Sequence, residues 1–338
     1  MNKLFHQITH SRLFWPVMAL LLILLANLFI SPGFFELEFR DGRVYGSLVD
    51  ILNRGAPVAL LAIGMSLVIA TGGVDLSVGA VIAITGAVCA NLLNSSADSL
   101  FIVISLGLFA GLVAGFINGS LVSFLGIQPI VATLVLMVAG RGIAQLINNG
   151  QIITFSHEGF AFLGVGSVLG LPTPVVIVLV VLAALHCLVR FTALGLFIEA
   201  VGCNPRASHL AGVHVNAVKL SVYCISGLCA ALAGMIITAD IQGADANNAG
   251  LWLELDAILA VVIGGSALTG GRFSLLLSVI GVLIIQALGT TILVSGIAPQ
   301  YNLLIKSLVI VAVLLLQAPL FKQQFKQQLS GLVRRRAA

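Results

Sequence analysis

The chain is built from long apolar runs that follow one another with short polar interruptions. Ten such runs are present, at residues 13–31, 53–70, 78–94, 100–124, 129–149, 173–191, 218–239, 256–270, 274–294 and 301–318. A helix needs about 20 apolar residues to cross the hydrocarbon core of a bilayer. Of the 338 residues 59% are hydrophobic and only 8% are charged, too few for a water-facing shell. The sequence therefore predicts an all-α polytopic membrane protein of about ten transmembrane helices, and excludes soluble enzymes and nucleic-acid-binding proteins.

The whole chain, 1–338, is expected to form a single transmembrane domain. Residues 13–318 hold the spans, 192–217 form the longest internal loop, and 319–338 form a basic tail. The first run is long enough to span and lacks the small-residue cleavage site of a signal peptide. It is therefore expected to be a membrane helix.

The distribution of charge predicts the orientation. With both termini in the cytoplasm, the inner segments hold eleven of the 16 Lys and Arg residues: Lys3, Arg12, Arg190, Arg206, Lys219, Arg272, Lys322, Lys326, Arg334, Arg335 and Arg336. Basic residues are retained on the cytoplasmic side of membrane proteins. We therefore expect both termini to be cytoplasmic. The basic tail is interpreted as an anchor to anionic lipid headgroups, with docking of a partner as the alternative.

A polar turn, TGGVDLSVG at 71–79, separates two of the apolar runs. Its glycines loosen the backbone, and Asp75 or Ser77 could cap the helix that follows. The alternative is a helix broken at membrane depth, where an acidic residue is usually functional. Both interpretations stay open. A similar Thr-Gly-Gly break recurs at 269–271, as expected if the chain contains an internal repeat.

Arg141 lies about twelve residues into its run and would be costly to leave unpaired in hydrocarbon. We expect it to face the interior of the helix bundle, where Gln128, Gln145 and Asn148 offer partners. Two interpretations of Arg141 are equally favoured: it lines the solute path, or it is a structural residue that forms several hydrogen bonds. The candidate path residues are Asp75, Asn118, Gln128, Arg141 and Gln145.

Gly107, Gly111, Gly115 and Gly119 recur every four residues and therefore share one face of a helix. Such a face lets another backbone approach closely. Packing within one helix bundle is the first interpretation. A subunit interface or a thin wall of the solute path is the second.

The loop 240–256 contains four acidic residues and no basic one. It is interpreted either as a plain outer loop or as a contact surface for a solute-delivering partner, with Asp245, Asn247, Asn248 and Trp252 as the contact residues. On the other side, 192–217 is prone to form a helix after Pro205. A short helix lying along the membrane surface would fit that segment.

The motifs of the common catalytic and ATP-binding sites are missing. No Gly-Lys pair occurs, so ATP cannot be held by a Walker A loop, and neither HExxH nor G-x-S-x-G is present. No His, Cys and carboxylate set has metal-ligand spacing. We therefore predict no catalytic residue, no metal site and no cofactor in this chain.

Four segments carry a resemblance to a known family: TGGVDLSVG at 71–79, the loop 195–212, SGLCAALAG at 226–234 and VIGGSALTGGR at 262–272. Over residues 50–318 the chain resembles the ribose, xylose and galactoside-type permeases of bacterial ABC sugar importers. The stretch GADANNAGLWLELDA at 243–257 is most similar to the permeases of galactofuranose importers.

The resemblance implies a transport subunit of the inner membrane that moves a monosaccharide, with galactofuranose as the candidate, by alternating access. It implies three partners: an ATPase with two nucleotide-binding domains, which binds ATP and Mg²⁺, a periplasmic sugar-binding protein, and a second, paralogous permease. The expected ATPase-coupling residues are Gly195, Glu199, Gly202, Asn204, Arg206, His209 and Gly212. The alternative is a secondary sugar carrier driven by a proton or sodium gradient, with Asp75 and Arg141 as coupling residues.

Overall fold

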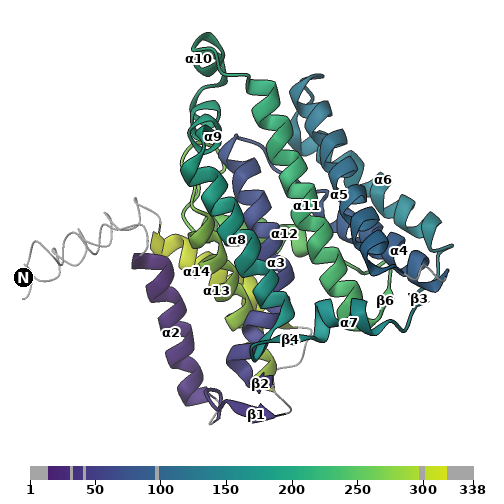
Figure 1. The fold of residues 1–338 in the computed structure, drawn as a ribbon. Coiled ribbons are helices and arrows are strands. Elements are labelled where there is room, and N and C mark those ends of the chain that lie inside the picture. Colours follow the sequence, from purple (N-terminus) through teal and green to yellow (C-terminus); the bar gives the residue numbers. More distant parts are fainter. Residues whose placement is uncertain (1–13, 31–32, 41–42, 96–98, 297–300, 318–338) are drawn as a thin grey trace, which may run out of the picture. The chain divides into compact units, whose positions relative to one another are not determined.

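The structure is a computed structural model that describes residues 14–30, 33–40, 43–95, 99–296 and 301–317 (Figure 1). The chain divides into two compact units, one of Met1–Phe34 with Ile284–Ala338 and the other of Phe35–Leu283. The predicted basic tail, 319–338, lies outside the described residues, as does the N-terminal segment 1–13.

Each of the ten predicted apolar runs contains a helix. These helices are α2 (Phe14–Ile30), α3 (Ser47–Ala70), α4 (Val78–Asn94), α5 (Leu100–Ser123), α6 (Pro129–Ile147), α8 (Thr173–Phe191), α11 (Val215–Ile241), α12 (Leu253–Ile263), α13 (Leu275–Val294) and α14 (Asn302–Gln317). The largest differences from the predicted bounds are at α3, which begins at Ser47 rather than at 53, and at α12, which ends at Ile263 rather than at 270. Gly265, Gly270 and Gly271 follow with φ of 85°, 91° and 98°, and this left-handed backbone cannot continue a helix.

Three short helices lie between these runs: α7 (Glu158–Val165), α9 (Ala193–Cys203) and α10 (Pro205–Leu210). The helix predicted after Pro205 is α10. The helix α9 was not predicted, and it fills most of the segment before Pro205. Side chains cap both: the hydroxyl of Thr192 accepts from the Leu194 amide at 3.3 Å, and Asn204 Oδ1 accepts from the Ala207 amide at 3.0 Å.

Six helices of the described residues are long and apolar enough to cross a membrane, namely α3, α5, α6, α8, α11 and α13. The helices α2 and α4 are apolar but have 17 residues each, at the lower end of what a bilayer requires. Helix length alone therefore does not reproduce the predicted number of about ten spans.

Three pairs of very short antiparallel strands were not expected in an all-α chain. They are β1 (Glu38–Arg40) with β2 (Arg43–Tyr45), β3 (Ile153–Thr154) with β6 (Gly243–Ala244), and β4 (Ser167–Val168) with β5 (Leu171–Pro172). In the longer-range pair Ile153 lies opposite Ala244. This pairing joins the segment after α6 to the segment after α11.

In the unit of Phe35–Leu283, α3 and α11 are the most buried of the candidate spans, and α11 packs against α3, α4 and α5. The glycine face of α5 lies on α11. A Cβ on Gly111 would lie 2.6 Å from Cβ of Ala231, and one on Gly115 would lie 3.0 Å from Cα of Cys224. Such distances are too short for a side chain, so packing within one bundle, the first interpretation of the glycine stripe, is confirmed.

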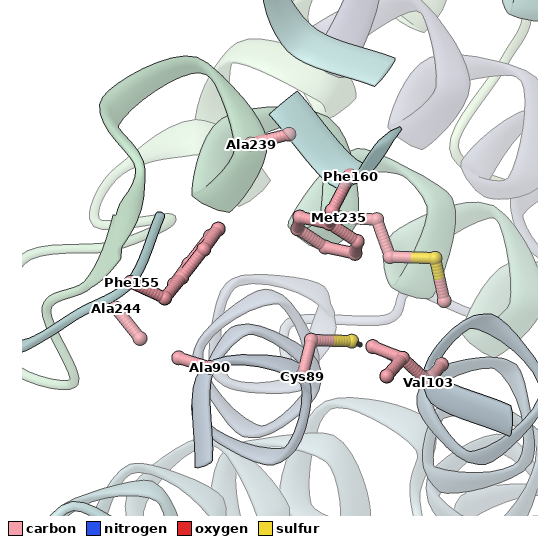
Figure 2. Packing of buried hydrophobic residues seen from close by; sticks show 8 residues of the cluster. All are labelled: Cys89, Ala90, Val103, Phe155, Phe160, Met235, Ala239 and Ala244. Atoms are coloured by element: carbon pink, nitrogen blue, oxygen red, sulfur yellow. Dashed lines mark hydrogen bonds between the residues drawn. The ribbon is translucent and has the colours of Figure 1, made fainter. Parts of the chain in front are cut away.

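A cluster of buried apolar side chains lies beside the β3–β6 pair, and Figure 2 shows its members from α4, α5, α7, α11 and the strand ends. The rings of Phe155 and Phe160 meet edge to face at 5.5 Å. Cys89 Sγ lies 3.8 Å from the carbonyl oxygen of Val103. The cluster therefore connects the ends of four helices to the strand pair.

In the other unit, α2 carries a buried polar residue on an otherwise apolar helix. Asn27 Nδ2 donates to Thr291 Oγ1 at 2.8 Å and to the Ile23 carbonyl at 3.0 Å. These bonds join α2 to the C-terminal part of α13.

Candidate functional site: two polar clusters and a glycine junction

The turn between α3 and α4 holds a buried carboxylate. Asp75 is 1% exposed, and its Oδ1 accepts from the Ser77 amide at 3.1 Å and from Ser77 Oγ at 2.6 Å. Its Oδ2 accepts from Ser226 Oγ of α11 at 2.9 Å. Asn118 Nδ2 of α5 donates in turn to Ser77 Oγ at 2.7 Å. Three donors therefore surround the carboxylate, and they connect the turn to α5 and α11.

This geometry bears on the two interpretations of Asp75. Ser77 occupies the N-cap position of α4, but its side chain makes no capping bond to the helix. Its hydroxyl is directed to Asp75 instead. Asp75 bonds the amide two residues ahead, as in an Asx turn. Neither residue therefore caps α4 with its side chain. The helix is broken at a point where the end of α3 and the start of α4 are both buried.

Arg141 is held by the loop after α11 rather than by its own helix. Its Nη1 donates to the Ala246 carbonyl at 3.1 Å and to the Ala249 carbonyl at 2.6 Å. The expectation that Gln128, Gln145 and Asn148 would be its partners was wrong. Carbonyl oxygens about one hundred residues further along the chain cannot be found by reading one helix.

Two of those expected partners bind the same loop by other bonds. Gln145 Nε2 donates to Asn247 Oδ1 at 2.7 Å, and Asn148 Nδ2 donates to the Ala244 carbonyl at 3.0 Å. Gln128 precedes α6 at the other end, about 20 Å from Arg141 at 1.5 Å per residue, and is exposed. One row of polar side chains on α6 therefore fastens the loop 244–249.

The loop also has its own internal structure. Asp245 Oδ1 accepts from the amides of Asn247 at 2.9 Å and Asn248 at 3.2 Å, and Oδ2 accepts from Asn248 Nδ2 at 2.7 Å. The hydrogen bond from the Asn248 side chain is the main cause that lowers the pKa of Asp245. The carboxylate thus binds two amides in the middle of the turn, while Arg141 binds the carbonyls of the residues on either side of them.

The end of this loop lies against α4. Gly250 has φ of 73°, and a Cβ there would lie 2.6 Å from the Gly79 carbonyl oxygen. Trp252 follows in the left-handed region with φ of 68° and is 58% exposed. Glu254 is 4% exposed, and its Oε2 has no hydrogen-bond partner among the described residues. The acidic loop is thus packed on α4 and α6.

Three segments that are far apart in the sequence meet at a set of glycines, which we call the glycine junction: Gly72, Gly202, Gly270 and Gly271. The Gly271 amide donates to the Ala70 carbonyl at 2.8 Å, and a Cβ on Gly270 would lie 3.0 Å from the Gly72 nitrogen. A Cβ on Gly202 would overlap the Ala70 carbonyl. The two Thr-Gly-Gly breaks therefore touch, and α9 ends against both.

The segment 192–217 forms α9, α10 and the start of α11, at the end of α8 and α11 away from β4, β5 and β6 (Figure 1). A cavity of about 870 Å³ lies beside α10 and is mainly apolar. Arg206, His209 and Leu210 line it together with Phe124 at the end of α5. Leu210 is 88% exposed and Phe124 is 61% exposed, so the groove presents apolar surface.

The candidate path residues thus fall into separate places. Asp75 and Asn118 share one hydrogen-bond network, Arg141 and Gln145 hold the outer loop, and Gln128 lies apart from both. Sequence reasoning missed the bond of Ser226 to Asp75 and the burial of Glu254. Ser226 could have been suspected as a polar residue inside an apolar run, but nothing local indicates which carboxylate it binds.

No group of three or more His, Cys, Asp or Glu side chains in the described part of the chain could hold a metal ion. The polar groups in both clusters donate to carbonyl, carboxylate, amide and hydroxyl oxygens of the chain itself. The arrangement is that of a helical bundle with broken helices and internal polar connections, and its class is an integral membrane protein.

Comparison with known proteins gives the family. The family model described as "Branched-chain amino acid transport system / permease component" matches residues 47–314, and the chain belongs to this family. It is a multi-pass membrane protein. Residues 71–79, 195–212 and 262–272, which contain the four glycines of the glycine junction, all lie within the matched range.

Among individual proteins, the chain is 57% identical over 312 residues to the galactofuranose transporter permease protein of Escherichia coli (strain K12), with 91% of each chain covered. It is 37% identical to the fructose import permease protein of Bifidobacterium longum (94% of this chain, 91% of the relative). It is 36% identical to the ribose import permease protein of Escherichia coli (strain K12) (88% and 91%). No solved structure matches the chain.

Proposed function

We propose that this chain is the permease subunit of an ATP-driven importer that carries galactofuranose across the bacterial inner membrane. The observation that carries the proposal is the 57% identity, over 91% of both chains, to a galactofuranose transporter permease. The fructose and ribose import permeases at 36–37% identity support a monosaccharide as the solute class. They also favour the importer over a carrier driven by an ion gradient.

In this proposal the chain binds no cofactor of its own. ATP and Mg²⁺ bind to a partner ATPase with two nucleotide-binding domains, a periplasmic binding protein delivers the sugar, and a second, paralogous permease completes the membrane part. The ten apolar helices cross the membrane as one transmembrane domain with both termini in the cytoplasm. In this proposal the remaining crossings are α2, α4, α14 and the run 256–270, of which α12 forms the part up to Ile263.

We place the ATPase at the segment 192–217. The support is geometric, because α10 and the first turn of α11 border an apolar groove of about 870 Å³ with Arg206 and His209 on its wall. The other proposed coupling residues are Gly195, Glu199, Gly202, Asn204 and Gly212. A push on α9 would reach the turn of Asp75 directly, because Gly202 contacts Ala70 at the glycine junction.

We place the solute path between the two polar clusters. The network of Asp75 and Asn118 lies at the broken end of α3, and Arg141 and Gln145 lie toward the outer loop. Alternating access requires helices that can exchange partners, and a carboxylate bonded directly to α11 and through Ser77 to α5 is suited to that. Gln128, at the other end of α6, would border the cytoplasmic side of the path.

The outer loop is the proposed contact for the binding protein. Asn247, Asn248 and Trp252 are exposed on a turn whose backbone is fixed by Arg141 and Asp245. A fixed, exposed turn loses little conformational freedom when a partner docks.

The test is reconstitution of the chain in proteoliposomes with its ATPase, partner permease and binding protein. We expect uptake of galactofuranose that requires ATP and exceeds the uptake of ribose and fructose. Uptake that persists without ATP, or that collapses with a proton uncoupler at constant ATP, would overturn the importer. ATP-dependent uptake of ribose but not of galactofuranose would overturn the substrate alone.

The proposed contact of the ATPase with the segment 192–217 has its own test. Charge reversal by Arg206→Glu is expected to leave ATP hydrolysis running while uptake falls, because the groove no longer fits the ATPase. Lys219→Glu, on the same part of α11 but outside the lining of the groove, is the matched control and is expected to keep uptake. Normal uptake by both variants would place the ATPase elsewhere.

A further inference from the structure

A second cavity, of about 360 Å³, lies at the C-terminal end of α8, beside α9 and the start of α13. Its polar wall comes from His186, Arg190, Thr192, Glu199 and Ser274. It is distinct from the groove beside α10, with which it shares no lining residue. All of its lining residues belong to the unit of Phe35–Leu283.

The cavity holds one cation and one anion that the chain does not pair. Arg190 and Glu199 both line it, yet neither makes an ion pair or a side-chain hydrogen bond with another described residue. The 20-residue helix α13 begins at Leu275 in the same wall, and its first amides add positive potential there. The cavity therefore offers a positive side at Arg190 and α13 and a negative side at Glu199.

The rim of the cavity is apolar and exposed. Of the lining residues, Leu196 is 69% exposed and Leu276 is 50% exposed, and Phe191, next to the lining residue Arg190 in the sequence, is 82% exposed. The adjoining helix α8 is a candidate membrane span of which 22% is buried within the chain. Most of its apolar surface therefore faces outward, and the cavity opens where that surface ends. An occupant suited to this place has a polar head and an apolar body.

We propose that the cavity binds the headgroup of a phospholipid of the phosphatidylethanolamine type. Its phosphate lies against Arg190 and the first amides of α13, its primary ammonium lies against Glu199, and its acyl chains follow α8. A headgroup with only a phosphate would leave Glu199 opposed by a like charge. A choline headgroup carries no N–H to donate. Glu199 and Gly195 are also proposed coupling residues, so the lipid would lie at the edge of the ATPase contact. The lipid site does not depend on which solute the permease carries.

The test is native mass spectrometry of the purified chain titrated with phosphatidylethanolamine, phosphatidylcholine and phosphatidylglycerol of identical acyl chains. We expect the ethanolamine lipid to bind in preference to both others. Glu199→Gln is expected to remove the preference over phosphatidylglycerol, and Arg190→Gln to weaken binding of the ethanolamine lipid roughly tenfold, as for loss of a charged hydrogen bond. Arg206→Gln, a cation outside this cavity, is the matched control and keeps the preference.

The outcomes separate this site from other anion sites. Equal binding of the three lipids by the unaltered chain, or a preference for phosphatidylglycerol, would overturn the proposal without any variant. Displacement of the bound lipid by inorganic phosphate alone would identify a simple anion site and would also overturn it. The ATPase is absent from the measurement, so its result is independent of the transport proposal.

Discussion

Asp75 is a carboxylate that the chain buries to 1% exposure and surrounds with hydrogen-bond donors. Moving a carboxylate out of water is costly unless its oxygens are satisfied. Here Ser77 and Ser226 donate to different oxygens, and Asn118 orients the hydroxyl of Ser77. Because these donors come from the turn, α5 and α11, the position of the broken helix depends on this one side chain.

Replacing Asp75 with Asn should lower the stability of the chain by about 1.5–3 kcal/mol, the worth of a hydrogen bond to a charged group. The amide keeps an acceptor for Ser77 but removes the charge to which three donors are directed. Thermal unfolding in detergent by size-exclusion chromatography measures the effect. The exposed Asp50→Asn change in the first turn of α3 would serve as control, and an equal midpoint for both variants would contradict the network.

Replacing Arg141 with Met should release the outer loop. The carbonyls of Ala246 and Ala249 lose their donor, so we expect amide hydrogen exchange in 244–250 to accelerate roughly tenfold. Arg141→Lys should have a smaller effect because an ammonium still donates. Exchange in α11, measured in the same experiment, should stay unchanged; slow exchange of the loop in Arg141→Met would show that Gln145 and Asn148 suffice to hold it.

The helices make their closest contacts at glycine residues, which have no side chain. Along α5, glycines let α11 approach to backbone contact, and at the glycine junction Gly202 lets the end of α9 reach the end of α3. Close approach of this kind gives dense packing without polar atoms. It also makes each element sensitive to the addition of one methyl group.

At α5, Gly115→Ala should destabilise the chain by about 1–3 kcal/mol, the usual cost of overpacking. The new Cβ would lie 3.0 Å from both Cα of Cys224 and the carbonyl carbon of Tyr223. Gly142→Ala is the matched control, since a Cβ there meets nothing within 4 Å and Ala favours a helix. The unfolding midpoint should fall for the first variant and hold or rise for the second; a reversed order would refute the packing.

At the glycine junction, Gly202→Ala should separate ATP hydrolysis from sugar uptake. A Cβ would overlap the Ala70 carbonyl, so α9 must shift away from the turn that carries Asp75. We expect uptake in proteoliposomes to drop while hydrolysis by the ATPase continues. Gly142→Ala again controls for the added methyl group, and unchanged uptake in Gly202→Ala would show that α9 transmits no movement through this contact.

At the scale of the whole molecule, the sequence predicts the positions of helices, because these depend on the local pattern of apolar residues. The run 78–94 predicts α4 to the residue, and the other apolar runs each contain a helix, because length and apolarity act within one segment. The partners of polar residues were not predictable in this way. Ser226 lies 151 residues after Asp75, and Ala249 lies 108 residues after Arg141. Such pairs depend on which helices are neighbours, which a single sequence does not specify.

The orientation of the whole chain can be tested by cysteine labelling of intact cells and inverted vesicles. Cys203 is exposed at the end of α9, so an impermeant maleimide should reach it from the cytoplasmic side. Asn247→Cys, in a chain without other exposed cysteines, should be labelled from the periplasmic side. Labelling of both positions from one side would contradict the predicted topology.

The glycine junction also limits how parts of this chain can be exchanged with those of other permeases. The segments around Gly72, Gly202 and Gly270 meet backbone to backbone, so their shapes must match one another as a set. In a chimera that receives only the segment 192–217 from a relative, the new segment would have to fit the unaltered turns at Gly72 and Gly270. Transplanting a docking loop therefore requires moving the turns 71–73 and 269–271 with it, as a single module made of three separate pieces of chain.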